Sequence, residues 1–506
     1  MRTSTEPVPR EQLTFKIEQS MSDKLISSVP TDLYIGGQWL PSADGKRIAV
    51  VDPATEKVIA EVASGAAADA GSAVDAAFAA GAEWSATPPR ARAEILRKAF
   101  ELMTERRQDI ATIISREEGK TLAEGLGEVA YAAEFFRWYA EEAPRTMGQF
   151  GRSPTGANNI LVDYCPVGVS LLITPWNFPA AMGTRKIAPA LAAGCTVILK
   201  PASETPLTAL ALAGLLEEAG VPAGVVNVLP SSRSSEISNR ILGDSRVGKL
   251  SFTGSTEVGR VLLAKASERI VNCSMELGGN APFIVLDDAD IEQAVSGAMI
   301  AKMRNAGESC IGANRFYVHA SIADEFADKF AAAMAGLKVG PGLDAGVDVG
   351  PLVNASTRDK VEHLVNEAVA RGARVLTGGK RPPGPGFFYT PTVLTGIDPE
   401  AEILHTEIFG PVAPIVPFET LSDVITRANA TIFGLAAYVY SGDVGRALAA
   451  AQQIDAGIVG VNRGFVSDPA APFGGMKQSG LGREGSQDGM HEFLEKKYIA
   501  VDWQHA

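Results

Sequence analysis

The 506-residue sequence has few of the side chains that bind metals or form disulfides. It contains 4 cysteines and 5 histidines, and no two cysteines stand at CxxC spacing. Neither a disulfide framework nor a structural zinc site is therefore indicated. The histidines are scattered and form no HExxH motif, so we expect no metal site.

Long apolar runs and clusters of positive charge are also missing. No segment approaches the roughly 18 apolar residues of a membrane-spanning helix, and the N-terminal stretch lacks the apolar region of a secretion signal. Acidic residues in that stretch argue against a mitochondrial presequence. The net charge is −13, which disfavours nucleic acid and anionic membranes as partners. We expect a cytoplasmic protein with a flexible tail over residues 1–30.

What is present is an ordinary globular composition, with 46% hydrophobic residues in a chain long enough for two or three domains. Alanine-rich helical patterns cover about residues 66–143. From Val167 onward, strand and helix patterns alternate, which is typical of an α/β fold with a parallel sheet. Thr205 before Pro206 predicts a helix start with a hydroxyl cap. A second alternating block follows Leu286 and predicts a second domain.

Three strands of the first block end in polar turns. These turns are Trp176-Asn177, Lys200-Pro201-Ala202-Ser203 and Gly254-Ser255. In an open α/β sheet a ligand lies across the carboxyl ends of the strands. The Gly-Ser turn precedes a helix, whose N-terminal N–H groups and dipole attract anions. It lacks the G-x-G-x-x-G pattern, so an ordinary strand-to-helix connection is the alternative.

Two residues are candidates for catalysis. Cys310 stands among small residues after a helix predicted over 290–303, and Asn305 to Gly307 interrupt that helix, so we expect the thiol in an accessible loop. A buried, inert thiol is the alternative. Glu276 stands among apolar and glycine residues, where a buried carboxylate suggests a general base. A solvated loop glutamate is the alternative.

With these residues named, the chain resembles the aldehyde dehydrogenase superfamily over about Leu33 to Trp503. Within it, the chain is most similar to members that oxidise succinate semialdehyde. The resemblance rests on seven motifs in family order: Thr174-Pro-Trp-Asn-Phe-Pro179, Lys200-Pro-Ala-Ser203, Phe252-Thr-Gly-Ser-Thr256, Met275-Glu-Leu-Gly-Gly279, Gly307-Glu-Ser-Cys310, Glu407-Ile-Phe-Gly-Pro411 and Pro472-Phe-Gly-Gly-Met-Lys477.

The resemblance implies a domain organisation. A Rossmann-type dinucleotide-binding domain would cover residues 31–147 and 167–279, and an α/β catalytic domain would cover 280–480. A small β arm from residues 148–166 and 481–506 would mediate oligomerisation. The expected assembly is a homodimer or a homotetramer.

The resemblance also implies the roles of three catalytic residues. Cys310 is the expected nucleophile, which forms a thiohemiacetal with the aldehyde. The Asn177 side chain and the Cys310 backbone N–H would hold the oxyanion. After the hydride leaves, Glu276 would activate the water that hydrolyses the thioester. A CoA-acylating variant and a non-catalytic structural protein of the same fold are the alternatives, and retention of these three residues argues against both.

The cofactor expected from the resemblance is NADP, with NAD as the alternative. Ser203 stands where NAD-selective members often carry glutamate, so a 2′-phosphate would not be repelled there. Lys200 and Arg233 would attract that phosphate. The residues that match the family's cofactor contacts are Trp176, Asn177, Lys200, Ser203, Gly254, Ser255, Leu277 and Glu407.

The substrate expectation rests on three residues, Arg185, Arg304 and Ser467, that match the carboxylate-binding residues of the members acting on succinate semialdehyde. Arginine forks bind carboxylates well. Glutarate semialdehyde or another aldehyde is the alternative, and structural salt bridges are the alternative roles for the two arginines. Glu308 departs from the usual glutamine. If its carboxylate lay near Cys310, it would raise the pKa of the thiol.

Overall fold

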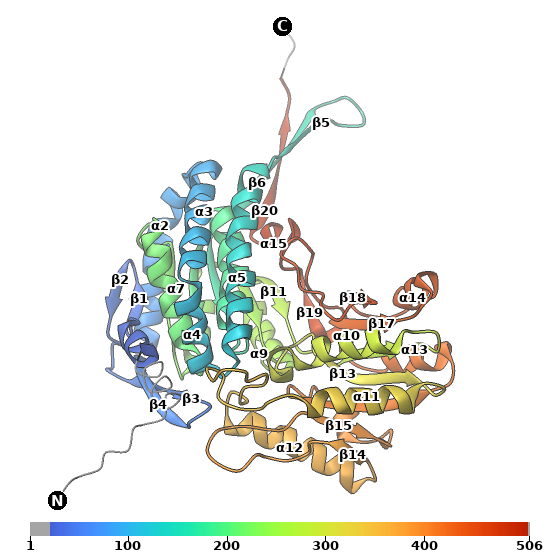
Figure 1. Cartoon of the computed structure of the whole chain (residues 1–506). Coiled ribbons are helices and arrows are strands. Elements are labelled where there is room, and N and C mark those ends of the chain that lie inside the picture. The colour runs from blue at the N-terminus through green and yellow to red at the C-terminus, as the bar shows by residue number, and fades with distance from the viewer. Residues whose placement is uncertain (1–20, 504–506) are drawn as a thin grey trace, which may run out of the picture.

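The computed structural model describes residues 21–503, which form two α/β units side by side, each built on its own sheet (Figure 1). The sheet of the first unit has the strand order β19-β11-β10-β7-β8-β9-β1-β2. Its parallel strands are β7 (Val169–Ile173), β8 (Thr196–Lys200), β9 (Val226–Val228), β10 (Val247–Thr253) and β11 (Asn272–Glu276). The antiparallel strands at its edges are β1 (Leu33–Ile35), β2 (Gln38–Leu40) and β19 (Gly480–Leu481). The predicted α/β class is confirmed.

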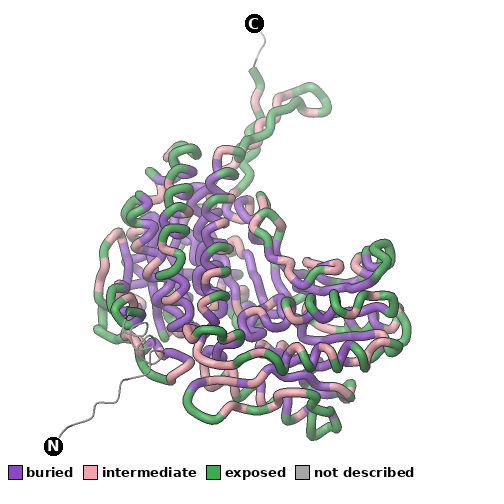
Figure 2. Tube along the Cα trace, viewed as in Figure 1, coloured by how far each residue is buried: buried purple, intermediate pink, exposed green. Residues whose placement is uncertain are grey.

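Helices cover both faces of this sheet, which explains why every residue of β7 and β8 is buried. One apolar core lies between the sheet and α3 (Pro89–Glu105), α4 (Arg107–Glu117), α5 (Leu122–Glu142), α6 (Pro179–Ala193) and α7 (Pro206–Glu218). A second core joins the other face to α2 (Ala67–Ala86), α8 (Ser234–Leu242) and α9 (Thr256–Ser267). The buried residues inside this layered arrangement appear in purple in Figure 2.

Helix α7 begins at Pro206 as predicted, but the expected hydroxyl cap is wrong. Thr205 makes no side-chain capping hydrogen bond. Instead, the buried Glu117 carboxylate at the end of α4 accepts the backbone N–H groups of Leu207 and Thr208 at 2.7 and 2.8 Å. The negative charge suits the positive end of the helix dipole. A residue ninety positions away therefore caps this helix.

The second unit contains a seven-stranded sheet in the order β14-β15-β16-β13-β12-β17-β18. Its strands are β12 (Ala281–Val285), β13 (Ala313–His319), β14 (Arg374–Thr377), β15 (Thr392–Thr395), β16 (Val412–Phe418), β17 (Ala436–Tyr440) and β18 (Ile458–Val461). Its helices are α10 (Ile291–Met303), α11 (Ala323–Ala335), α12 (Ala355–Ala370), α13 (Leu421–Asn429) and α14 (Val444–Ala451). Two apolar clusters pack on its two faces, so this unit has its own core, as predicted.

A narrow three-stranded arm projects from the body in Figure 1. It consists of β5 (Gln149–Arg152), β6 (Asn159–Pro166) and the C-terminal β20 (Leu494–Val501), which pairs antiparallel with β6 after the short helix α15 (Asp488–His491). A separate hairpin joins β3 (Arg47–Asp52) to β4 (Lys57–Ala63).

The predicted flexible tail over residues 1–30 is too long. Residues 21–28 are helical, and Ile26 is buried in the core of the first unit because its apolar side chain packs there. Arg116 on α4 also forms an ion pair with Asp23 at 2.8 Å. The first twenty residues of the predicted tail lie outside the described residues.

Candidate active site

A cavity of about 650 Å³ is lined by residues of both units. Thirteen of the residues singled out from the sequence line it: Trp176, Asn177, Arg185, Lys200, Ser203, Gly254, Ser255, Glu276, Leu277, Arg304, Cys310, Glu407 and Ser467. The carboxyl ends of β7, β8 and β10 meet there, since Ile173 pairs with both Lys200 and Phe252. The three polar turns predicted to share one edge of the sheet therefore do so.

Cys310 lies in the turn between α10 and β13. Asn305, Ala306 and Gly307, which interrupt the helix as predicted, have left-handed backbone φ angles of 55°, 51° and 80°. Gly279 approaches this turn so closely that a Cβ on it would lie 2.4 Å from the Cys310 carbonyl oxygen. Burial raises the pKa of the Cys310 thiol to about 12; Arg185 and Arg304 oppose the shift, whereas Glu407 and Glu276 add to it.

Glu276 ends strand β11 and is 3% exposed. Neither of its carboxylate oxygens has a hydrogen-bond partner in the described protein. Burial and the nearby Glu484 raise the pKa of Glu276 well above its usual range, although Arg185 and Lys186 oppose the shift. A buried, unpaired carboxyl group with a raised pKa is suited to act as a proton acceptor.

The two arginines that line the cavity have different surroundings. Arg185 on α6 forms an ion pair with Glu484 at 2.5 Å, and its guanidinium lies 4.2 Å from the centre of the Phe473 ring. Arg304 donates a hydrogen bond to the Ser467 hydroxyl at 3.2 Å. Aromatic rings surround its guanidinium, with centroids at 4.7 Å (Phe178), 4.9 Å (Phe465) and 5.8 Å (Tyr131). Within the described chain, Arg304 has no carboxylate at ion-pair distance.

The other end of the cavity suits a nucleotide. The buried Lys200 ammonium donates to the Pro201 carbonyl at 3.0 Å, and no carboxylate of the described residues lies within ion-pair distance of it. Burial lowers the pKa of Lys200 to about 8, and Glu204 opposes the shift. Ser255 caps helix α9 by accepting from Val258 N–H at 3.3 Å. A lysine without a counterion beside a helix N-terminus fits a phosphate-bearing ligand.

Glu407 and Arg233 complete the description of this end. Glu407 accepts a hydrogen bond from the Gly279 N–H at 3.0 Å, and burial raises its pKa to about 7. The expected part of Arg233 in cofactor binding is not supported. Arg233 forms an ion pair with Asp44 at 2.6 Å and is absent from the cavity lining, because Asp44 provides a nearer anion.

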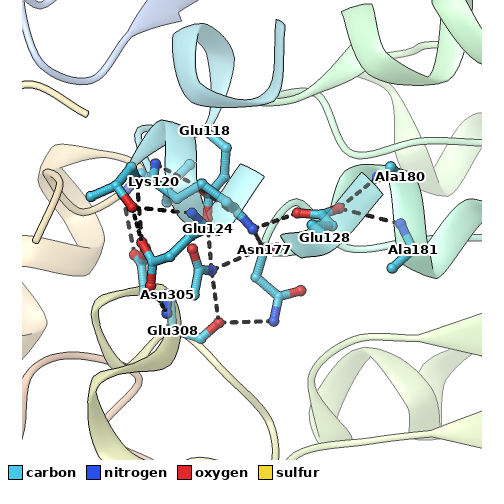
Figure 3. A network of polar contacts seen from close by, with 11 residues as sticks. Glu118, Lys120, Glu124, Glu128, Asn177, Ala180, Ala181, Asn305 and Glu308 are labelled. Carbon is cyan, nitrogen blue, oxygen red and sulfur yellow. Dashed lines mark hydrogen bonds and ion pairs between the residues drawn. The ribbon is translucent and has the colours of Figure 1, made fainter. Parts of the chain in front are cut away.

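The expected effect of Glu308 on the thiol is also corrected. Its side chain accepts a hydrogen bond from the Val353 N–H at 3.1 Å and does not line the cavity. Its backbone carbonyl faces the site instead, where it accepts the Asn177 side-chain N–H at 3.0 Å (Figure 3). Glu407 and Glu276, rather than Glu308, are the carboxylates that raise the pKa of Cys310 most.

Several residues of the site were not found from the sequence. They are Glu484, which pairs with Arg185 and Lys186; the rings of Tyr131, Phe178 and Phe465; and Glu204, which lines the cavity beside Lys200. Glu204 directly follows the predicted Ser203 and was detectable as a charge next to a ligand residue. Phe178 directly follows the predicted Asn177 and Phe465 stands two residues before Ser467, whereas Glu484 and Tyr131 come from distant segments and carry no local signal.

The fold and the site together define a two-unit α/β protein whose shared cavity holds a thiol, a buried carboxylate and a lysine without a carboxylate partner among the described residues. The aldehyde dehydrogenase family model matches residues 39–499. The chain belongs to the aldehyde dehydrogenase family.

Individual relatives agree with this assignment. The chain is 55% identical to a succinate-semialdehyde dehydrogenase of Paenarthrobacter nicotinovorans, over 88% of this chain and 99% of that protein. It is 47% identical to a glutarate-semialdehyde dehydrogenase of Pseudomonas putida, over 92% of this chain and 97% of the relative. A crystal structure of an NADP-dependent enzyme of E. coli superimposes with a TM-score of 0.93 at 46% identity, covering 94% of this chain and 98% of that one.

Two features are absent from residues 21–503. No helix among them is both long and apolar enough to cross a membrane. In the same part of the chain, no group of three or more His, Cys, Asp or Glu side chains could hold a metal ion.

Proposed function

We propose that the protein oxidises an ω-carboxylated aldehyde, succinate semialdehyde to succinate, with NADP, and with NAD as the alternative cofactor. The observation that carries this proposal is the environment of Arg304, a ring-enclosed cation that lines the cavity and has no carboxylate at ion-pair distance among the described residues. A substrate carboxylate would supply the missing negative charge, and Ser467 would add a hydrogen bond. The relatives named for succinate and glutarate semialdehydes support the same substrate class.

The proposed reaction uses three residues of this chain. The Cys310 thiolate attacks the aldehyde carbon, and the Asn177 amide and the Cys310 backbone N–H stabilise the oxyanion of the thiohemiacetal. A nicotinamide held in the cavity would supply the hydride acceptor, and loss of the hydride from the thiohemiacetal leaves a thioester on Cys310. Glu276 removes a proton from a water molecule, which attacks the thioester and releases the carboxylic acid and the thiol. The buried, unpaired carboxyl group of Glu276 supports this role.

Lys200, Ser203, Glu407 and the Gly254-Ser255 turn are proposed to hold the nucleotide. The uncompensated Lys200 and the N-terminus of α9 suit phosphate groups. Serine at position 203 leaves room for a 2′-phosphate without a repelling charge. The first unit is accordingly proposed as the dinucleotide-binding domain, and the second as the catalytic domain.

The substrate proposal is tested by steady-state kinetics on the wild type and Arg304→Ala, with succinate semialdehyde, glutarate semialdehyde and propanal. We expect kcat/KM for succinate semialdehyde to fall about 100-fold, since loss of a charge-assisted carboxylate contact costs about 1.5–3 kcal/mol. Propanal, which has no carboxylate, should lose far less, because only the higher pKa of the Cys310 thiol acts on it. Arg137→Ala, which removes an arginine near the Phe100 ring outside the cavity, is the matched control. A wild type that treats the three aldehydes alike would contradict the proposal.

We further propose that the β5–β6–β20 arm joins copies of the chain into a homodimer or homotetramer. Phe150 on this arm is 63% exposed and stacks on Trp503, and Met147, two residues before the arm begins, is 78% exposed. Exposed apolar groups on a projecting sheet favour a protein partner. Phe150→Glu should lower the mass measured by light scattering, whereas Phe78→Glu, at an exposed phenylalanine on α2, should not. An unchanged mass in Phe150→Glu would remove the arm as the interface.

A further inference from the structure

A buried cluster of charged and amide side chains contacts the backbone of Asn177 (Figure 3). Its buried members are Glu118, Lys120, Glu128 and Asn305. None of them lines the cavity, and none takes part in the reaction proposed above. Burying several charges together is costly unless each has partners, so the contacts of this cluster indicate what it holds in place.

Lys120 connects this cluster to the turn that carries Asn177. Its ammonium donates to the Asn177 backbone carbonyl at 2.7 Å and to Glu128 at 2.6 Å. The other oxygen of Glu128 accepts the N–H groups of Ala180 and Ala181 at 2.8 and 3.2 Å. These N–H groups belong to the first turn of α6, so Glu128 also caps that helix. The backbone of Asn177 is thus held at its carbonyl and through the helix that follows it.

Asn305 connects the same turn to the nucleophile segment. Its side-chain N–H group lies 2.9 Å from the Asn177 carbonyl and 3.2 Å from the carbonyl of Glu308, two residues before Cys310. It also donates to Glu118 at 2.8 Å. The Asn177 side chain donates to the same Glu308 carbonyl at 3.0 Å. A single amide therefore binds both segments that supply the proposed oxyanion donors.

The backbone at Asn305 is held in an uncommon conformation. Its φ and ψ angles of 55° and 46° are left-handed, and Ala306 follows at φ 51°. The Asn305 N–H donates to the Glu124 carboxylate at 2.6 Å, which fixes the segment in this shape. Asparagine tolerates this conformation better than other residues with a Cβ. Backbone strain of this kind persists only where surrounding contacts enforce it.

We infer that Asn305, supported by Lys120, is a positioning residue for the oxyanion site. It fixes the Asn177 amide relative to the Cys310 backbone N–H, so that both donors point to one oxygen. This inference rests on the proposed roles of Asn177 and Cys310. Preorganised donors act only when their positions are set before the reaction, which is what these contacts provide.

The first test is Asn305→Gly, because glycine accepts the left-handed backbone while it removes the amide. We expect kcat to fall about 10- to 100-fold, less than the 10²–10³-fold cost of losing an oxyanion donor itself. The KM of the aldehyde and the Kd of NADP, measured by fluorescence, should change less than threefold. Glu117→Gln is the matched control, since Glu117 is a buried carboxylate that caps α7. It should lower the Tm but leave kcat unchanged.

A double-mutant cycle separates positioning from a general structural role. If Asn305 acts through Asn177, Asn305→Gly should cost almost nothing in kcat when Asn177 is already alanine. Asn305→Asp, which keeps the shape but removes the donors, is the second variant and should behave like glycine. The proposal is overturned by near-wild-type kcat in either variant, by an equal loss in the Asn177→Ala background, or by failure of both variants to fold. The kcat of the wild type with any aldehyde that it oxidises serves as the reference. Failure of the substrate proposal is therefore distinguished from failure of the positioning proposal.

Discussion

Arg185 and Arg304 border the same cavity, yet their charges are balanced in different ways. Arg185 is paired with Glu484, which also binds Lys186. Arg304 is enclosed by aromatic rings and has only the Ser467 hydroxyl as a hydrogen-bond partner among the described residues. Burial alone would raise the pKa of Glu484, but Lys186 and Arg185 outweigh that effect and lower it. The described residues therefore supply a carboxylate counterion for Arg185 and none for Arg304.

This difference teaches how to separate a structural cation from a binding cation in one pocket. A buried charge is costly without a partner, so a cation that lines a cavity without one is expected to meet its counterion in the ligand. By this criterion we expect Arg304 and Lys200 to bind charged groups of the ligands. Arg185 lowers the pKa values of Cys310 and Glu276.

Removing the carboxylate that pairs with Arg185 should have the largest effect on the stability of the protein. Glu484→Gln leaves Arg185 and Lys186 buried without their carboxylate, and removal of one partner from a buried pair costs about 3–5 kcal/mol. Urea denaturation at pH 7 measures this loss in the free energy of unfolding. Glu142→Gln, which breaks a pair with the exposed Arg145, should cost about 1 kcal/mol or less. Arg304→Ala should also cost little, and a large loss there would contradict the comparison.

The pH dependence of Cys310 alkylation tests how these arginines act on the pKa of the thiol. Because the thiolate is the reactive form and its pKa is raised to about 12, alkylation of the free enzyme by iodoacetamide should accelerate about tenfold per pH unit from pH 7 to 10. Arg304→Ala should slow the reaction at each pH, since this arginine lowers the thiol pKa. Mass spectrometry of the Cys310 peptide follows the reaction, with Cys310→Ser as the blank. An alkylation rate that stops rising below pH 9 would show that the pKa of the thiol is raised less than this.

The smallest expected effect concerns Lys200, at the end of the cavity that is proposed to bind the cofactor. Glu204 lines the cavity and opposes the lowering of the Lys200 pKa, so its charge partly offsets the attraction of Lys200 for phosphate. Glu204→Gln should lower the KM for NADP about two- to fivefold, in keeping with 0.2–1 kcal/mol for a partly exposed charge pair, and leave that for NAD unchanged. Glu218→Gln on the outer side of α7 is the control. An equal change for both cofactors would place Glu204 away from the 2′-phosphate.

Local patterns predicted most of the architecture. The alternation from Val167 onward defined both sheets, and the break at residues 305–307 located the turn of Cys310, because each depends on side chains close in sequence. The motifs and the family resemblance supplied thirteen of the residues that line the cavity. The predicted tail over residues 1–30 is too long, because Ile26 packs into a core formed by residues that are distant in the sequence.

Contacts between distant segments could not be predicted in the same way. Glu117 caps a helix 90 residues away, and Glu484 pairs with Arg185 across about 300 residues. The expected phosphate contact of Arg233 failed because Asp44, brought near by the fold, binds it instead. Charged side chains have several acceptable partners in sequence, and only the three-dimensional arrangement selects one.

The pairing of β19 with β11 sets a condition on the order of synthesis. Leu481 and Gly480 complete the edge of the first sheet beside Glu276, and Glu484 follows three residues later. A nascent chain that has already emerged from the ribosome through residue 276 therefore has an open sheet edge and two uncompensated cations until the second unit has also been translated. The first sheet is therefore complete only after residues 480–484 have been translated, and a product that lacks these residues has neither the β19 edge strand nor the carboxylate of Glu484.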